Sequence, residues 1–123
     1  MISAMSERTP SEVHALFADA FNRGDVEALV ALYEPGAVLI TGGQPVVGHE
    51  AIRATYQRLV ARGGRMELET RTVIESGAGL AVLHASWTYH SAGKVTPGIS
   101  TEVVRRQSDG TWLFVIDEPS TPQ

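Results

Sequence analysis

The sequence predicts an α+β fold in which the helices come first and an antiparallel sheet follows. Apolar residues recur with the helical period of about 3.6 in the first half, and the period changes to 2 from Arg65 onward. A turn sequence, Ser108-Asp109-Gly110, then separates two runs rich in β-branched and aromatic residues and predicts a hairpin near the end. We therefore expect the element order α-α-β-α-β-β-β-β.

We predict a single domain, because a chain of 123 residues can bury a modest core without disulfides or a metal. Residues 1–8 are expected to form a flexible lead, 9–119 the domain and 120–123 a short tail. The first ten residues lack a basic leader, and no window approaches the roughly 20 apolar residues that span a bilayer. We therefore expect no membrane partner.

Three helices are predicted from capping residues and apolar stripes. The first begins at Thr9-Pro10-Ser11-Glu12, with Thr9 as N-cap and Pro10 at the first helical position. Asp25 caps a short second helix, and the third runs from His49 to Ala61. The expected buried stripes are Val13, Leu16, Phe17, Ala20 and Phe21; then Val26, Leu29, Val30 and Tyr33; then Ile52, Tyr56, Leu59 and Val60.

The strands follow from alternation and from turn residues. A short strand is expected at 37–40, followed by a loop with Gly42-Gly43 and Pro45. In the next strand Met66, Leu68, Thr70, Thr72 and Ile74 should share the buried face. A strand at 80–90, a loop at 91–98 and the terminal hairpin complete the chain. The run 112–116 is apolar at consecutive positions, which predicts cover on both faces.

Composition excludes several functional classes. Without cysteine there are no disulfides, thiolate nucleophiles or cysteine-ligated metals, which fits a cytoplasmic protein. Fourteen acidic residues against ten basic ones give a formal charge of −4, and no basic stripe is present, so nucleic acid is not an expected partner. No phosphate-binding loop or nucleophile elbow occurs, and we expect no cofactor.

The ordered set of local motifs resembles the NTF2-like superfamily, specifically its SnoaL-like branch with a cystatin-like α+β cone. The residues that carry the resemblance are 21–25 (Phe-Asn-Arg-Gly-Asp), 29–33, 48–52 (Gly-His-Glu-Ala-Ile), Arg105-Arg106, 109–112 (Asp-Gly-Thr-Trp) and Ile116-Asp117. The resemblance implies a curved sheet wrapped around the helices, a conical cavity, and a homodimer formed through the outer sheet face. It covers about residues 10–120.

The superfamily includes isomerases, cyclases, epoxide hydrolases, dehydratases and non-catalytic association domains, so the fold alone does not give the function. The sequence departs from the branch at Gly36, where relatives often carry an acid, and at Glu118, where many have a histidine. Three hypotheses stay open. One is a cofactor-free acid/base enzyme of isomerase, cyclase, dehydratase or hydrolase type, acting on a small apolar molecule. The second is a non-catalytic ligand-binding or association domain, and the third is a stress- or pathway-associated accessory protein without a small-molecule ligand.

Asp117 is the first candidate for a catalytic group, because a carboxyl at the cavity end of an apolar strand can have its pKa raised by desolvation. The simpler interpretation is a strand-end carboxylate bonded to a loop amide or to Ser120. Glu118 should face the opposite way, because successive side chains alternate. Tyr33 is the second catalytic candidate, as a hydroxyl donor, and Tyr56 is the alternative donor.

Candidate substrate-binding residues are Trp87, Tyr56, Tyr89, Ile40 and Met66. Trp87 and Tyr89 share the more apolar face of their strand, which we assign to the cavity; as plain core residues they would need no ligand.

No metal site is predicted. His84 and His90 lie six residues apart on one strand, about 20 Å, which is too far to bind one ion. Their face is expected to be the outer one. Glu102 and Arg105 lie on opposite faces of a strand, so at most one of them reaches the cavity.

Overall fold

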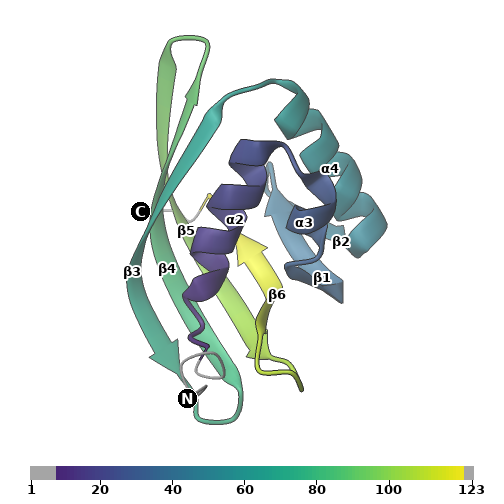
Figure 1. The fold of residues 1–123 in the computed structure, drawn as a ribbon, viewed down its shortest axis with the longest axis vertical. Helices are drawn as coiled ribbons and strands as arrows, with labels where there is room; N and C mark the ends of the chain where they lie inside the picture. Colours follow the sequence, from purple (N-terminus) through teal and green to yellow (C-terminus); the bar gives the residue numbers. More distant parts are fainter. Residues whose placement is uncertain (1–7, 121–123) are drawn as a thin grey trace, which may run out of the picture.

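The computed structural model describes residues 8–120 and has the predicted α+β fold (Figure 1). Within these residues three helices cover one face of a single sheet: α2 (Glu12–Arg23), α3 (Val26–Val30) and α4 (His49–Ala61). Residues 1–7 of the predicted flexible lead at 1–8, and residues 121–123 of the predicted tail, lie outside the described residues. None of the helices in the described part is long and apolar enough to cross a membrane.

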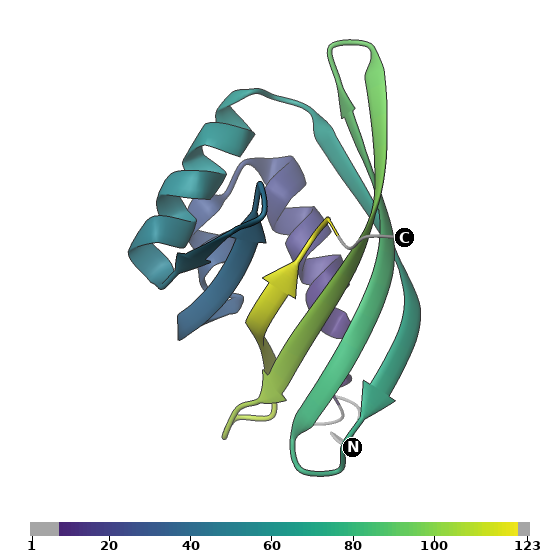
Figure 2. The same cartoon turned by 180° about the vertical axis from the view of Figure 1, so that it is seen from behind.

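The sheet is strongly curved, and its far side is seen in Figure 2. Its strands follow the spatial order β2-β1-β6-β5-β4-β3, with β1 parallel to β6 and every other neighbouring pair antiparallel. The strands are β1 (Tyr33–Thr41), β2 (Gln44–Val47), β3 (Arg65–Glu75), β4 (Leu80–Ser91), β5 (Lys94–Arg106) and β6 (Trp112–Glu118). The three longest form a meander that runs past the ends of the helices (Figure 1).

The predicted order lacked β2, so the expected loop after β1 is wrong. Gly42 and Gly43 have φ of 58° and 76°, the backbone that a two-residue hairpin turn requires. Pro45 pairs with Ile40 and is tolerated because β2 is an edge strand. The predicted loop at 91–98 is likewise mostly strand. The loop was predicted because of Pro97, since proline is uncommon inside strands. Pro97 lies on the stretch of β5 that does not pair with β6.

The buried stripe of α2 also differs from the prediction. The helix begins at Glu12 after Ser11, and not at Thr9-Pro10. Leu16 is 42% exposed, whereas His14 is only 4% exposed. The inward positions are therefore 13, 14, 17, 20 and 21. This stripe has the same 3.6 period as the predicted one, but it turns a histidine toward the sheet.

A bulge in β3 changes which residues face inward. Met66, Leu68 and Thr70 are half-buried on the predicted face, but the pairing with β4 shifts between Thr70 and Thr72. One extra residue reverses the alternation, so the predicted burial of Ile74 is wrong and this residue is 59% exposed.

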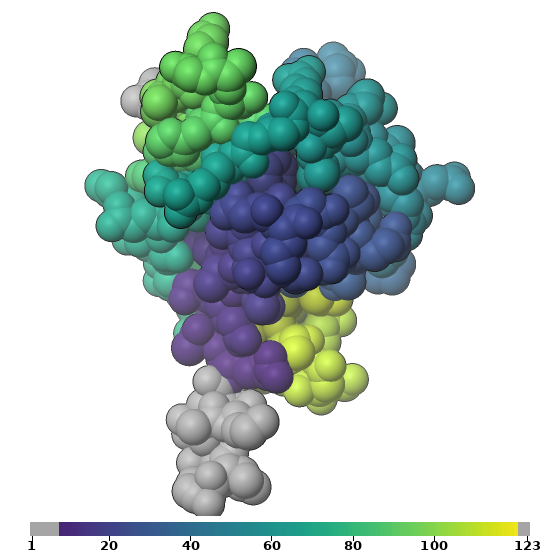
Figure 3. All heavy atoms as spheres, turned by 45° about the horizontal axis from the view of Figure 1, so that its top comes forward, coloured from purple at the N-terminus to yellow at the C-terminus, as the bar shows by residue number. Residues whose placement is uncertain are grey.

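The core lies between the helices and the concave face of the sheet, and Figure 3 shows the helices packed in front of it. Aromatic rings dominate its centre. Phe17 contacts Tyr56 edge-on at 5.8 Å between ring centroids, and Tyr33 contacts Phe114 at 4.8 Å. These contacts join α2, α4, β1 and β6, and they fix the elements that carry the site.

Candidate functional site

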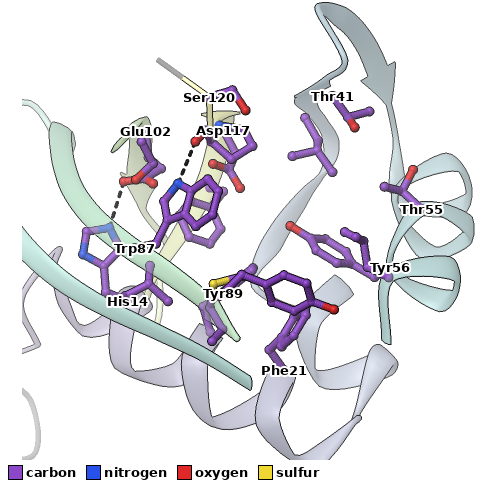
Figure 4. Close-up of a pocket in the computed structure, with 18 of the residues that line it drawn as sticks. His14, Phe21, Thr41, Thr55, Tyr56, Trp87, Tyr89, Glu102, Asp117 and Ser120 are labelled. Atoms are coloured by element: carbon purple, nitrogen blue, oxygen red, sulfur yellow. Dashed lines mark hydrogen bonds and ion pairs between the residues drawn. The ribbon is translucent and has the colours of Figure 1, made fainter. Parts of the chain in front are cut away.

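A pocket of about 240 Å³ lies between α2, α4 and the concave face of the sheet (Figure 4). Most of its wall is aromatic or aliphatic, with a few polar groups among these side chains, as is typical of small-molecule sites. The lining residues used below are His14, Leu39, Thr41, Tyr56, Met66, Trp87, Tyr89, Ser100, Glu102, Asp117 and Pro119.

Asp117 reaches this pocket because β6 contains a bulge. The pairing with β5 runs from Val104–Phe114 to Val103–Ile116, so one residue of β6 is extra. The bulge leaves Phe114 and Asp117 inward and turns Ile116 outward, where it is 42% exposed. Without it, residues 114 and 116 would share a face and Asp117 would point outward.

Two tyrosines hold the Asp117 carboxyl. The Tyr33 hydroxyl donates a hydrogen bond to Asp117 Oδ2 at 2.5 Å and lies 2.5 Å from the Tyr56 hydroxyl. Tyr33 comes from the start of β1 and Tyr56 from α4, and all three side chains are at most 5% exposed. Because the Tyr33 hydroxyl hydrogen is used in the bond to Asp117, Tyr56 donates to the Tyr33 oxygen.

Burial raises the pKa of Asp117 to about 8, and the nearby charge of Glu102 adds to this shift. The hydrogen bond from Tyr33 opposes the shift but does not cancel it. Desolvation, with the neighbouring Asp117 charge, also raises the pKa values of Tyr33 and Tyr56 well above their ordinary value. At neutral pH, then, Asp117 holds a proton and both tyrosines remain hydrogen-bond donors.

Glu102 provides a second carboxyl in the same pocket. It lies directly opposite Asp117 in the β5–β6 pairing, so the two side chains are neighbours on one face. Glu102 is 3% exposed, and its Oε1 lies 2.8 Å from Nε2 of His14, as the dashed line in Figure 4 marks. The other ring nitrogen of His14, Nδ1, lies 2.7 Å from the Thr70 hydroxyl.

This hydrogen-bond chain fixes the state of the histidine ring. A carboxylate only accepts, so Nε2 of His14 carries a proton and donates to Glu102. Both ring nitrogens of His14 have hydrogen-bond partners, so the histidine orients Glu102. Only Oε1 of Glu102 is used in this contact, and the second carboxylate oxygen can bind a molecule in the pocket.

Trp87 lies flat over β5 because its partner in the adjacent strand is Gly98. A Cβ atom at Gly98 would fall 2.0 Å from the indole ring. The indole Nε1 donates to the carbonyl of Pro119 at 2.7 Å and so holds the chain after β6 against the pocket. The Tyr89 hydroxyl donates to the carbonyl of Gly63 at 2.6 Å, which orients that ring across the end of β3.

The comparisons with known proteins agree with this architecture. The family model described as a SnoaL-like domain matches residues 13–118. The chain belongs to the SnoaL-like domain family. No curated protein matches it.

Several solved structures share the fold of this SnoaL-like domain. An NTF-2 like protein of unknown function from Shewanella oneidensis MR-1 is similar, with TM-score 0.80, 20% identity, and 89% of this chain and 94% of that one covered. A putative calcium/calmodulin-dependent protein kinase type II association domain from Thiobacillus denitrificans ATCC 25259 has TM-score 0.78, 20% identity, and coverage of 94% and 96%. A ketosteroid isomerase-like protein from Erwinia carotovora atroseptica SCRI1043 has TM-score 0.71, 25% identity, and coverage of 92% and 95%.

Most of the candidate residues named from the sequence lie together in the pocket of this SnoaL-like domain. Asp117, Tyr56, Trp87, Tyr89 and Met66 line the pocket. Tyr33 lies behind it and acts on Asp117. Ile40 was expected on the wall, but Leu39 and Thr41 take that place because alternate residues of β1 face inward.

The simpler interpretation, in which Asp117 bonds to a loop amide or to Ser120, is wrong about the partner, which is Tyr33. The amide of Ser120 donates to Glu118, at 3.0 Å, and not to Asp117. Glu118 follows Asp117 on the opposite face, as predicted.

The remaining candidates lie away from the pocket. His84 bonds Thr72, and His90 bonds Glu67 on the sheet surface. Arg105 pairs with Glu34 at 2.8 Å. Within the described residues no group of three potential metal ligands was found.

Two functional groups, His14 and Glu102, were not selected from the sequence. The signal for His14 was its place in the 13, 14, 17, 20, 21 stripe of α2. For Glu102 the signal was its position two residues from Ser100 and Val104 on one strand face.

Proposed function

We propose that this SnoaL-like domain is a cofactor-free acid/base enzyme that moves a proton on a small, neutral and largely apolar molecule. The single observation that supports this most is the Glu102–Asp117 pair, two buried carboxyls opposite each other in one pocket with different partners. Carboxyls whose environments differ in this way suit separate roles as base and acid. Isomerisation, by proton transfer next to a carbonyl, is the reaction type that needs only these groups.

Glu102 is the proposed base. Its carboxylate takes a proton from the carbon next to a carbonyl, and the electron pair of the broken C–H bond moves toward the carbonyl oxygen. His14 donates to Oε1, so the second oxygen is the one that accepts the proton. His14 acts through Glu102 and is a positioning residue, and Thr70 in turn orients His14.

Asp117 is the proposed acid. Its pKa of about 8 keeps it protonated at neutral pH, so it can donate to the oxygen on which negative charge develops. Tyr33 donates to Oδ2, which leaves the proton on Oδ1. The proton held on Glu102 can then return to a different carbon, which completes an isomerisation without any cofactor. Trp87, Tyr89, Tyr56 and Met66 provide the wall for the apolar part of the molecule.

Proton exchange in D₂O tests this proposal without knowledge of the natural substrate. A panel of neutral cyclic ketones is incubated with the protein, and loss of the α-proton signals is followed by NMR. We expect catalysed exchange with at least one ketone, a loss of at least 100-fold in Glu102→Gln, and a smaller loss in Asp117→Asn. Glu118→Gln is the matched control, since it changes the adjacent carboxyl on the other face. Equal exchange in Glu102→Gln and wild type would refute the assignment of the base.

A non-catalytic ligand-binding or association domain is the second candidate. The observation that favours it is that both ring nitrogens of His14 are already bonded, so the pocket offers no free imidazole. Ligand binding that raises the melting temperature, with no exchange for any ketone, would support this second candidate.

We also propose a homodimer formed through the outer sheet face. Branched apolar residues form one row across five strands on that face: Val38, Ile116, Val103, Val82 and Ile74. Such a continuous row is typical of an interface. Light scattering after size exclusion should give the mass of a dimer for wild type and of a monomer for Val103→Glu. A monomeric wild type would contradict the proposal.

A further inference from the structure

The pocket contains one buried hydroxyl for which the described residues supply no partner. Ser100 is 2% exposed, lines the pocket, and its Oγ makes no hydrogen bond with the described residues. Leaving a buried hydroxyl unbonded destabilises the folded protein, so such groups are rare and need an explanation. The carboxyls of Glu102 and Asp117 do not bond to Ser100, because their hydrogen bonds are made with His14 and Tyr33.

The residues around Ser100 leave room beside its hydroxyl. Along β5 its neighbours on the same face are Gly98 and Glu102, and its partner in β4 is Ala85. Gly98 and Ala85 are small, so no side chain from these two positions can reach across to satisfy Ser100. Trp87 covers Gly98. The hydroxyl therefore lies between the indole ring and the Glu102 carboxyl.

The charges of the lining determine which atom can bind there. Among residues 8–120, two carboxyls, Glu102 and Asp117, line the pocket, and neither arginine nor lysine does so. A ligand carboxylate would be repelled by Glu102 and would find no cation to bind. An uncharged oxygen would meet no such penalty, since a serine hydroxyl can donate to a carbonyl or accept from an alcohol.

We propose that Ser100 is a specificity-determining residue that binds a carbonyl or hydroxyl oxygen of a neutral ligand. It selects oxygenated molecules over hydrocarbons of the same shape and over carboxylates. This inference rests on the proposed function only in assuming that the pocket takes a small molecule, because the selectivity does not require catalysis.

Three probes of the same size test the inference: acetophenone, its hydrocarbon analogue α-methylstyrene, and benzoate. Dissociation constants are measured from the fluorescence of the tryptophans, one of which lines the pocket. Wild type should bind acetophenone roughly five- to tenfold more tightly than α-methylstyrene, which corresponds to about 1–1.4 kcal/mol for the hydrogen bond. Benzoate should bind more weakly than either. Ser100→Ala should lower the ratio between the first two by weakening acetophenone alone.

A second readout separates binding from a structural role. The carbonyl stretch of bound acetophenone should move to higher wavenumber in Ser100→Ala, because a hydrogen bond to the carbonyl is lost. The free variant should be as stable as wild type or more stable, since the change removes an unsatisfied buried hydroxyl. Ser86→Ala, on the neighbouring strand and the outer face, is the matched control and should leave the ratio and the stretch unchanged.

The outcomes are distinguishable. An unchanged preference and an unchanged stretch in Ser100→Ala would overturn the role of Ser100 while leaving the proposed function intact. If neither acetophenone nor α-methylstyrene binds wild type, the pocket is not a small-molecule site of this kind, and both the inference and the proposed function are overturned.

Discussion

Replacing Asp117 by asparagine should remove a loss of stability that wild type undergoes as the pH rises from 5 to 7. Asparagine has nearly the same shape and its side-chain oxygen can still accept the hydrogen bond from Tyr33, so the packing is retained. What the substitution removes is the titration of a buried carboxyl whose pKa is raised from 3.8 to about 8, chiefly by desolvation.

The sign and size follow from proton linkage. Between pH 3.8 and about 8 the native state keeps the proton on Asp117, whereas the unfolded state has released it. The unfolded state therefore binds fewer protons, and the free energy of unfolding falls with rising pH. The slope is about 1.4 kcal/mol per pH unit for one proton, so the change from pH 5 to 7 is about 3 kcal/mol. Both pH 5 and pH 7 lie between the pKa of Asp117 in the unfolded state, 3.8, and its pKa in the native state, about 8.

Urea denaturation at pH 5, 6 and 7, followed by tryptophan fluorescence, measures this change. The difference in unfolding free energy between Asp117→Asn and wild type should grow by about 3 kcal/mol in favour of the variant, since the other titrating groups cancel. Glu118→Gln should keep the slope of wild type because Asp117 is still present. Parallel profiles for Asp117→Asn and wild type would refute the raised pKa.

Three further substitutions test the contacts around the pocket. Tyr33→Phe removes the side-chain hydrogen bond that lowers the pKa of Asp117, so stability should go on falling with rising pH to a point above pH 8. A fall that still ends at pH 8 would contradict this. His14→Leu leaves Glu102 buried without a donor and should destabilise by about 3–5 kcal/mol, most of which His14→Leu with Glu102→Leu should recover in urea titrations. Failure to recover would mean that the loss is one of packing. Gly98→Ala should displace Trp87 and shift tryptophan emission to the red, whereas Gly36→Ala, where nothing lies within 4 Å, should not; identical spectra would contradict the contact.

The elements with a strong period could be predicted from the sequence. The helix at His49–Ala61 has the predicted bounds, and β4 turns Trp87 and Tyr89 inward as alternation requires. β2 was missed because an edge strand of four residues with a proline depends on its partner for its structure.

The site itself depends on features that local patterns do not encode. Asp117 faces the pocket only because β6 contains a bulge, and no residue type in the run 112–116 marks one. That bulge also sets the register that brings Glu102 opposite Asp117. A register shift of one residue reverses the face of every later side chain, so the sequence could suggest Asp117 but could not supply its partner.

The protonation state of Asp117 is the central claim, and ¹³C NMR measures it directly. Protein labelled at the aspartate carboxyl carbons is titrated from pH 3 to 10, and the resonance of Asp117 is assigned by its absence from Asp117→Asn. We expect this resonance to change with a midpoint at about 8, so that the carboxyl is protonated at pH 7 in the native protein. A midpoint near 4 would mean that Asp117 is ionised at pH 7, and it would contradict the proposed role of this residue as the acid.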